Sequence, residues 1–434
     1  MIFVPVLLHI SRRRRPLNNE VLVAGLDIGT TKVCAVIGEI DENGSLEITG
    51  VGICPSTGLR KGVVVNIEAT LRSVSQAIEA AEMMSGREIH ECWTGIGGSH
   101  IDGINSRGVV AVTGRNRETR EIGADDIKRV LEAAQAVLIP MDRKVLEVIP
   151  QSFIVDNQRG IPDPLNMIGV RLEAEVHIIT CSTTGAQNLI KCVNRAGFKV
   201  RDLLLQTLAA GRAVLAPEEK EQGVALVDLG GGTTNLLVYS GGAPYSISTI
   251  PAGGNEVTRD ISIMRNISIE TAEKIKLDSG CCWEPFIMGE NEDVIVPGVG
   301  GRPPQSIPKS QILTIIGPRM EETFKLVKEE LDRLSLSRTP GHGVVLTGGG
   351  AQLLGAAELA SRVFKLPVRI GSPLPVGGLV EEYRSPAYST AVGLVLEGYD
   401  RALKAGVRGA APAPVQGSPS VWEKLKDWIE KEFF

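Results

Sequence analysis

The sequence predicts an α/β protein built from two similar lobes, each a doubly wound unit of strands and helices. The first observation is the segment Gly223–Tyr239, in which an apolar strand leads into an acidic residue, a glycine turn and two threonines. The second is a copy of that order of residues at Val21–Ile40. The third is that apolar strands are followed by segments of helical period, which is the pattern of doubly wound folds.

In the segment Gly223–Tyr239, Val224–Asp228 is a short aliphatic run without turn formers, typical of a strand buried on both faces. Glycine has no Cβ, so the run that follows can turn with positive φ and bring backbone N–H groups close to an anion. The tip of this hairpin holds the candidate phosphate-binding residues Gly230, Gly231, Gly232, Thr233 and Thr234. Taken alone, such a glycine run is more often only a tight turn.

The copy at Val21–Ile40 makes the phosphate interpretation much more specific, because two such hairpins predict two lobes facing each other across a cleft. Asp27 and Asp228 stand at equivalent strand ends. A hydrated Mg²⁺ on a nucleotide keeps most of its waters, and carboxylates can hold it through them. The candidate ligand-binding residues of the first hairpin are Gly29, Thr30, Thr31 and Lys32.

Composition limits the remaining possibilities. A chain of 434 residues is long enough for two to four subdomains with their own cores. A formal net charge of −5 gives no global electrostatic basis for nucleic-acid binding, so no nucleic-acid partner is expected. The seven cysteines show no metal-type spacing, which favours reduced thiols.

Residues 1–20 are predicted to be a disordered N-terminal extension or an overcalled start. The apolar run Ile2–Ile10 is too short to span a bilayer, and the basic run Arg12–Arg15 follows it, whereas in a signal peptide the charges come first. A weak interfacial anchor is the alternative. No other segment approaches a transmembrane length, so membrane contact is expected to be peripheral.

The first lobe continues with further strands and one amphipathic helix. Expected elements are strands at Glu47–Gly52, Val63–Asn66 and Glu88–Ser99 and a helix at Ile67–Ser85. Between residues 104 and 179 the pattern changes to a small inserted subdomain. Its expected elements are a helix at Ala124–Ala136 and strands around Val145–Val155, Met167–Leu172 and Ala174–Thr180.

Two segments of small residues are predicted to cross each other where the lobes are joined. After a helix at Thr184–Ala196 and a strand at Lys199–Leu205 comes Gln206–Leu215, rich in alanine and glycine. The helix at Tyr388–Tyr399 has the same character. Small residues let two helices approach closely, so the pair is a candidate hinge.

A second insertion is predicted after Gly253. It includes a helix at Ser268–Leu277, on which Glu273 and Lys276 share a face. A loop at Gly298–Pro308 and a long helix at Ser310–Leu334 follow.

The nucleotide theme resumes at Val344, where a strand enters a turn containing Gly348, Gly349 and Gly350. The turn is expected to pass directly into a helix at Leu354–Phe364, so that the backbone can approach an adenosine at the N-terminus of that helix.

The tail predicts membrane contact. Residues 405–420, rich in Pro, Ala and Gly, are expected to form a flexible linker, and residues 421–434 an amphipathic helix. Its apolar face comprises Trp422, Leu425, Trp428, Ile429 and Phe433. Tryptophan suits the membrane interface, and the mixed charge of the other face leaves insertion to apolar burial. The alternative is a terminal helix docked on the protein's own core.

Several of these segments resemble a known family. The two hairpins, the crossing segments that start at Gln206 and Tyr388 and the turn Thr347–Ala351 are similar to the five nucleotide-site motifs of the actin, Hsp70 and sugar kinase superfamily. Within it, TGIGGSHIDGINSRGVVAV, IETAEKIKLDSG and the ending of linker plus helix resemble the FtsA family of bacterial cell division proteins. The resemblance covers about Leu22–Tyr399 and the final helix.

The resemblance implies an actin-like two-lobed ATPase fold of two RNase H-like subdomains, each with an inserted subdomain, plus a C-terminal amphipathic helix. Subdomain 1A would comprise residues 21–103, 180–215 and 381–404, and the inserted FtsA-type subdomain 1C residues 104–179. Subdomain 2A would comprise residues 216–253 and 339–380, and subdomain 2B residues 254–338.

For function, the resemblance implies an ATP- and Mg²⁺-binding protein that polymerises with itself on the cytoplasmic face of the cell membrane at the division septum. It would anchor the FtsZ ring through its terminal helix and recruit later division proteins. Glu273 and Lys276 would grip the ribose and adenine, and Arg319 and Glu322 would meet the FtsZ C-terminal tail. With Asp27 and Asp228, Gln206 would complete a catalytic set by positioning the attacking water, although these residues do not establish more than weak ATPase activity.

Other members of the superfamily are the alternatives. A PilM-like pilus-assembly protein or an MreB-like shape protein is also an actin-like membrane scaffold. An Hsp70-type chaperone would need a large peptide-binding β domain, whereas only a linker and one helix follow the nucleotide module. A sugar kinase would need a carboxylate base over a sugar pocket, which the sequence does not reveal.

Overall fold

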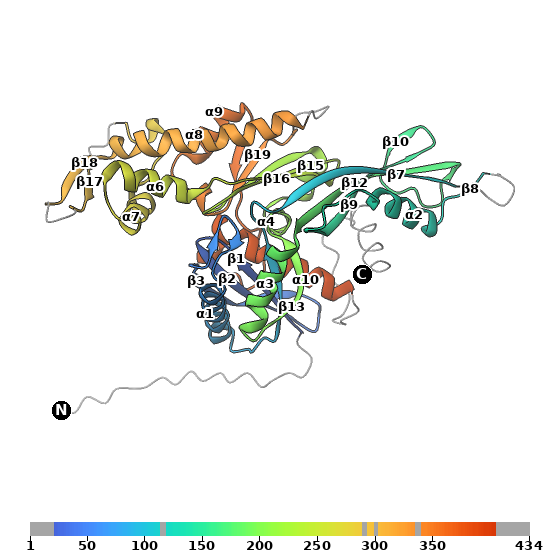
Figure 1. The fold of residues 1–434 in the computed structure, drawn as a ribbon, viewed down its shortest axis with the longest axis horizontal. Helices are drawn as coiled ribbons and strands as arrows, with labels where there is room; N and C mark the ends of the chain where they lie inside the picture. Colours follow the sequence, from blue (N-terminus) through green and yellow to red (C-terminus); the bar gives the residue numbers. More distant parts are fainter. Residues whose placement is uncertain (1–20, 113–118, 289–292, 299–302, 335–339, 405–434) are drawn as a thin grey trace.

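The computed structural model describes residues 21–112, 119–288, 293–298, 303–334 and 340–404 (Figure 1). In the first lobe, β1 and β2 form an antiparallel hairpin, β3 continues it, and β6 and β13 add in parallel on the other side of β1. The strands of this sheet are β1 (Val21–Ile28), β2 (Lys32–Ile40), β3 (Leu46–Pro55), β6 (Glu91–Ile96) and β13 (Lys199–Leu205).

The sheet of the second lobe repeats this topology. Its antiparallel meander β14-β15-β16 is extended in parallel by β19 and β20 next to β14. The strands are β14 (Val224–Leu229), β15 (Thr234–Ser240), β16 (Ala243–Ile250), β19 (Val344–Thr347) and β20 (Val368–Ile370). The prediction of two similar lobes is therefore confirmed.

Helix α1 (Ile67–Ser85) packs against β2 and β3 and has the predicted bounds. Asn66 caps it by accepting a hydrogen bond from the backbone N–H of Ala69 (3.0 Å), and Gly86 ends it in the left-handed region with φ 69°. Because Asn66 belongs to this cap, the strand expected at Val63–Asn66 is shorter. It is β5 (Val63–Val64), paired with β4 (Leu59–Arg60).

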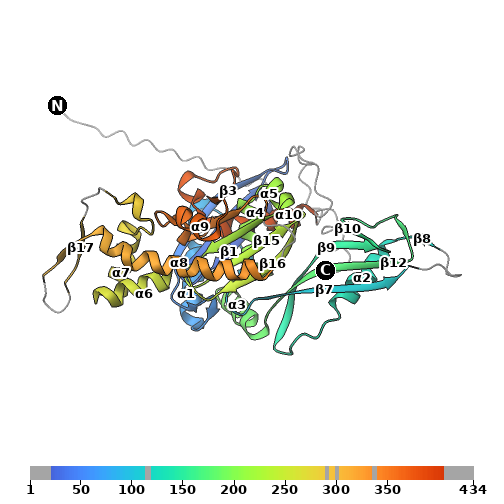
Figure 2. The same cartoon turned by 90° about the horizontal axis from the view of Figure 1, so that it is seen from above.

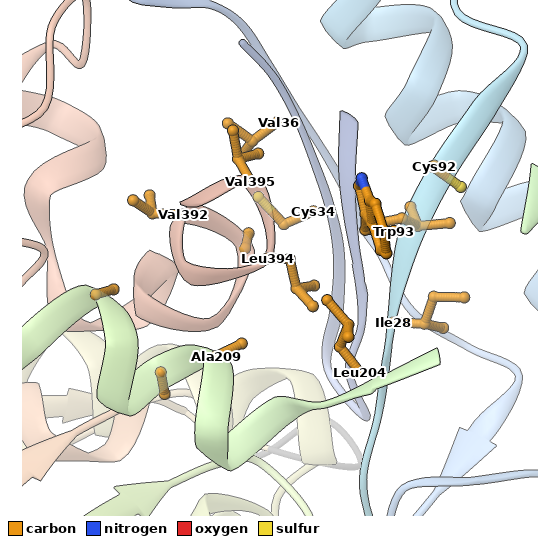
Figure 3. Packing of buried hydrophobic residues seen from close by; sticks show 14 of the residues in the cluster. Ile28, Cys34, Val36, Cys92, Trp93, Leu204, Ala209, Val392, Leu394 and Val395 are labelled. Atoms are coloured by element: carbon orange, nitrogen blue, oxygen red, sulfur yellow. The ribbon is translucent and has the colours of Figure 1, made fainter. Parts of the chain in front are cut away.

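Helices α4 (Gln206–Val214) and α10 (Ser389–Lys404) cross as predicted. A Cβ on Gly393 would lie 1.8 Å from the backbone oxygen of Ala209, so glycine is required at this contact. Figure 3 shows Ala209 and Leu394 of these helices within the hydrophobic core of the first lobe. Helix α3 (Thr183–Arg195) packs beside α1.

The first insertion extends sideways from the two lobes (Figures 1 and 2). Its sheet has the order β10-β9-β12-β7, and α2 covers one face. The elements are β7 (Asp102–Ala111), β8 (Arg120–Glu121), α2 (Ala124–Gln135), β9 (Arg143–Val155), β10 (Gln158–Ile161), β11 (Ile168–Gly169) and β12 (Arg171–Ser182). Its sheet also touches the second lobe, because Gln151 Nε2 donates to the backbone oxygen of Tyr245 on β16 (2.8 Å).

The sequence predicts two strands here, at Met167–Leu172 and Ala174–Thr180. The structure also has two, β11 and β12, but they separate at Val170 and not at Glu173. Glu173 interrupts the apolar pattern in the sequence without interrupting the strand. Its carboxylate is nearly buried because it pairs with Arg107 and with Arg171, the latter at 3.0 Å.

The second insertion consists of a helical layer and a short hairpin against β14 and β15. Its elements are α6 (Gly254–Arg265), α7 (Ile269–Ser279), β17 (Asp293–Val296), β18 (Gln305–Pro308) and α8 (Lys309–Arg333). Two helices belong to the second lobe itself: the short α5 (Pro217–Gln222) precedes β14, and α9 (Ala356–Phe364) follows β19 and packs on α8. The loop expected at Gly298–Pro308 is wrong at its end, because β18 pairs with β17 and buries Ile307.

In the part of the chain that the structure describes, no helix has the length and apolar character needed to cross a bilayer. The N-terminal extension, the linker and the amphipathic helix with its five apolar residues lie outside the described residues.

Candidate nucleotide site

The two predicted hairpins end in the same tight turn. In the first, the backbone N–H of Gly29 donates to the oxygen of Lys32 (2.9 Å), and in the second Gly230 donates to Thr233 (2.9 Å). Asp27 and Asp228 are the next-to-last residues of β1 and β14, and each is 8% exposed. The structure thus places the repeated acid and the repeated turn in matching positions of the two lobes.

The glycines of the second hairpin serve close approach and not a positive φ. Gly230, Gly231 and Gly232 all lie outside the positive-φ region, contrary to the predicted turn. A Cβ on Gly231 would lie 2.3 Å from Cγ2 of Thr31, and one on Gly232 would lie 2.8 Å from Oγ1 of Thr30. The tips of the two hairpins therefore contact each other across the two lobes.

The carboxylates of Asp27 and Asp228 have little positive charge near them. Burial, with a smaller contribution from the nearby Asp228, raises the pKa of Asp27 to about 6 against the opposing effects of Lys32 and Gln206. Burial also raises the pKa of Asp228, against a hydrogen bond from Asn235 and the charge of Lys32. Two buried carboxylates with one nearby ammonium form a site that a cation would stabilise.

Lys32 is itself buried enough that its pKa is lowered, with Cys34, Asp27 and Asp228 opposing this effect. Its ammonium donates to the backbone oxygen of Ala387 and lies 4.4 Å from the centre of the Tyr388 ring. Lys32 therefore connects the first hairpin to the segment that precedes α10.

Gln206, the first residue of α4, lies beside Asp27. Its amide Nε2 donates to Oδ1 of Asp27 (2.7 Å) and to the backbone oxygen of Ile28 (3.3 Å). Gly97 leaves room for it, because a Cβ there would lie 2.0 Å from Oε1 of Gln206. The structure thus brings the predicted water-positioning residue to the first acid.

Glu273 and Lys276 face each other on α7, as predicted, with Nζ of Lys276 2.7 Å from Oε2 of Glu273. Lys276 also donates to Oγ1 of Thr258 (2.9 Å) and to the backbone oxygen of Gly254 (3.2 Å). The backbone N–H of Gly254 in turn donates to the oxygen of Gly230 (3.0 Å). These contacts attach the pair of helices α6 and α7 to the second hairpin.

The third glycine turn lies against the second acid. Gly348 has φ 81°, and a Cβ there would lie 2.3 Å from Oδ1 of Asp228, whereas Gly350 packs on Leu229 and Gly349 faces open space. The expected direct passage into a helix is wrong. A 3-10 turn at Gly349–Gln352 comes first, and α9 begins only at Ala356.

Asn235 is a site residue that sequence reasoning missed. It stands directly opposite Asp228 in the β14–β15 pairing and hydrogen-bonds its carboxylate. Its own Oδ1 accepts from Oγ1 of Thr249 (3.1 Å). The antiparallel register would have revealed it, because the residue after Thr234 must face the end of β14.

Arg319 and Glu322 lie on α8, in the second insertion and away from the hairpins. Arg319 donates to Oδ2 of Asp260 on α6 (2.6 Å) and pairs with Glu322, whose side chain is 58% exposed. The structure therefore does not bring these predicted partner-binding residues to the nucleotide site, consistent with a separate role.

The repeated lobes, facing hairpins and crossing helices define an actin-like fold. A solved PilM-PilN type IV pilus biogenesis complex is similar, with a TM-score of 0.63 at 17% identity over 87% of this chain and 98% of the other. MreB5 of Spiroplasma citri bound to ADP has a TM-score of 0.50 at 16% identity, over 90% of this chain and 98% of the other.

Sequence comparison defines the family within that fold. The model of the cell division protein FtsA matches residues 225–393, and the model of the SHS2 domain inserted in FtsA matches residues 98–180. FtsA of Borreliella burgdorferi is 44% identical over 413 residues, covering 95% of this chain and 99% of that protein. FtsA of Escherichia coli K12 is 40% identical over 420 residues, covering 95% and 98%. The chain belongs to the FtsA family and is an actin-like cell division protein.

Proposed function

We propose that the protein binds ATP with Mg²⁺ between its two hairpins, polymerises on the cytoplasmic face of the cell membrane at the division septum, and tethers FtsZ there. The observation that supports this proposal is the contact of the two hairpin tips, with Asp27 and Asp228 at equivalent strand ends near enough to interact electrostatically. A nucleotide bound at these tips would touch both lobes, so its presence would set their relative position.

The residues present fit Mg²⁺ held through water. Asp27 and Asp228 are buried acids with raised pKa values, which a divalent cation would lower. Within the described residues, no group of three or more His, Cys, Asp or Glu side chains could hold a metal ion, so phosphate and water would supply the remaining ligands. The metal would neutralise phosphate charge beside Lys32.

In this proposal, the turn residues contact the phosphates of the nucleotide, and helices α6 and α7 contact its ribose and adenine. Gly29, Thr30, Thr31 and Gly230–Thr234 would line the phosphates. Glu273 and Lys276 would face the ribose and adenine, since Lys276 reaches the backbone that supports the second hairpin. Gly348 and Gly350 keep the third turn close to Asp228 and Leu229.

We propose that the protein acts by binding ATP more than by hydrolysing it. The amide nitrogen of Gln206 donates hydrogen bonds to Asp27 and to the backbone oxygen of Ile28, which orients the Asp27 carboxylate. The Oε1 of Gln206 is the group that could accept a hydrogen bond from a water molecule and so orient it. We propose that nucleotide occupancy controls assembly with other copies of the chain, and that many terminal helices on one polymer hold the membrane by avidity.

Tethering of FtsZ is assigned to α8. Arg319 is fixed by Asp260, and the exposed Glu322 lies beside it, so the pair presents both charges to a partner. Later division proteins would meet the same polymer.

The experiment is liposome co-sedimentation of the full chain with FtsZ in the presence of ATP. FtsZ is expected in the pellet only when this chain is present, and FtsZ without its C-terminal tail is expected to stay in the supernatant. Glu322→Lys is expected to release FtsZ, whereas Glu329→Lys, an exposed acid on the same helix, is not. Equal pelleting of tailless FtsZ would contradict the tether.

A further inference from the structure

A third loop reaches the point where the hairpins meet. It is the turn Lys61–Gly62 between β4 and β5. The backbone N–H of Gly62 donates to Oγ1 of Thr30 (3.1 Å) on the first hairpin. A Cβ on Gly232 of the second hairpin would lie 3.1 Å from Cα of Lys61. The turn thus touches both phosphate hairpins at once.

The same turn is also held by the segment Gly98–Ser99, which follows β6 of the first sheet. The backbone N–H of Ser99 donates to the oxygen of Lys61 (3.3 Å), and a Cβ on Gly98 would lie 2.8 Å from that oxygen. Its backbone is therefore held on two sides by hydrogen bonds and close packing, so the Lys61 side chain is the part of the turn that can move toward a ligand.

Lysine is an unexpected residue for this backbone. Lys61 has φ 50° and Gly62 has φ 77°, as in a type I′ turn, where Asn-Gly and Asp-Gly are favoured. The other non-glycine residues with positive φ in the described ranges are three Asx residues and a helix C-cap: Asp156, Asn166, Asn266 and Lys365. A lysine at a backbone conformation that favours Asn suggests that its side chain has a functional role.

The Lys61 side chain is also available to bind a ligand. It is half-buried, and it makes no hydrogen bond or ion pair with the residues that the structure describes. Lys32, by contrast, is engaged with Ala387 and the Tyr388 ring. A polyphosphate held at the hairpin tips would bring several negative charges beside two carboxylates, more than Lys32 and one Mg²⁺ would neutralise, so a further cation would stabilise it.

We infer that Lys61 is a further nucleotide-binding residue, whose ammonium contacts the phosphates held at the hairpin tips. The inference rests on the proposed function, since it concerns ATP bound at the same hairpins. Lysine is a suitable residue for this contact because its ammonium is a mobile point charge with three donors.

The test is titration of the full chain with ATP and with ADP, followed by calorimetry, in Mg²⁺. Lys61→Asn removes the charge and installs the favoured Asn-Gly turn, so the folded state should be retained. We expect it to weaken both nucleotides about tenfold, the size of a lost hydrogen bond to a charged group. Lys61→Arg should retain most of the affinity. Lys199→Asn, at the opposite end of the first sheet, should not change it.

Unchanged affinity of the Lys61→Asn protein would overturn the inference while leaving the proposed function intact. So would a loss in Lys61→Arg as large as in Lys61→Asn, because it would assign the effect to the backbone of the turn. If the unmodified chain itself binds neither nucleotide, the proposed function fails, and the inference fails with it.

Discussion

Gln206 donates its side-chain amide to the carboxylate of Asp27 at 2.7 Å, although 178 residues separate them in the chain. The bond joins the first residue of a helix at the lobe crossing to the strand end of the first hairpin. A movement of α4 relative to the first sheet would therefore change the environment of a buried acid. In the proposed function, this contact would link nucleotide binding to the crossing of α4 with α10.

Gln206→Ala is expected to move the acidic limb of Mg-ATP binding to higher pH. The Gln206 hydrogen bond lowers the pKa of Asp27, so its removal lets that pKa rise above its value of about 6. Calorimetric ATP affinities between about pH 5 and 8 measure the shift. Gln222→Ala, at an exposed position, is the control, and an identical pH profile for the two variants would refute the role of Gln206.

Asp27→Asn is expected to stabilise the protein without nucleotide at neutral pH. The pKa of Asp27 rises from 3.8 to about 6 in the folded state, so the folded chain holds this proton more tightly than the unfolded chain. The free energy of unfolding therefore falls as pH rises from about 4 to about 6, by about 3 kcal/mol for this group. The variant lacks this loss.

Urea unfolding of the Asp27→Asn variant and the unmodified protein at several pH values provides the measurement. The difference in unfolding free energy should grow in favour of the variant across that window. Asp278→Asn, at an exposed position, should show no such trend. A difference that stays constant with pH would mean that Asp27 is not the buried, proton-holding group.

Features fixed by neighbouring residues were predictable from the sequence. The bounds of α1 are correct because Asn66 is a local start signal and Gly86 a local stop signal. The hairpins are correct because strand, acid and glycine follow one another directly. The pair Glu273 and Lys276 follows from helical spacing alone.

Features that depend on distant partners were not predictable. The glycines at 231 and 232 avoid a clash with Thr30 and Thr31 of the other lobe, which no local pattern encodes. Strand β18 exists because β17 pairs with it, and Glu173 stays inside a strand because Arg107 neutralises it. The Lys61–Gly62 turn lies at the site because it contacts Thr30 of the first hairpin and Gly232 of the second, and both contacts depend on the folded structure.

Gly393→Ala is expected to lower the free energy of unfolding by about 1–3 kcal/mol or more, as an overpacked core contact does. Its Cβ would meet the backbone oxygen of Ala209, which cannot rotate away as a side chain can. Urea unfolding without nucleotide measures the loss. Gly349→Ala is the control, since a Cβ there faces open space, and equal stability of both variants would remove the close crossing from the fold's requirements.

Ending the chain at Arg408 is expected to abolish liposome co-sedimentation and to leave ATP affinity unchanged. The apolar face that includes Trp428 is then missing, and apolar burial drives the insertion of such helices. Trp428→Glu in the full chain should have the same effect, and Glu430→Gln on the polar face should not. Membrane binding retained by the shortened chain would contradict the assignment of the tail.

Asp228→Asn is expected to weaken ATP binding about tenfold or more in Mg²⁺ and to leave it nearly unchanged in EDTA. The carboxylate would hold the metal through water, so the variant removes one anchor while Asn keeps the volume of the side chain. Gly348 approaches Oδ1 of this residue too closely for a larger substitute to be informative. Calorimetric titration under both conditions measures the difference. An equal loss with and without Mg²⁺ would assign Asp228 to the packing of the turn and not to the metal.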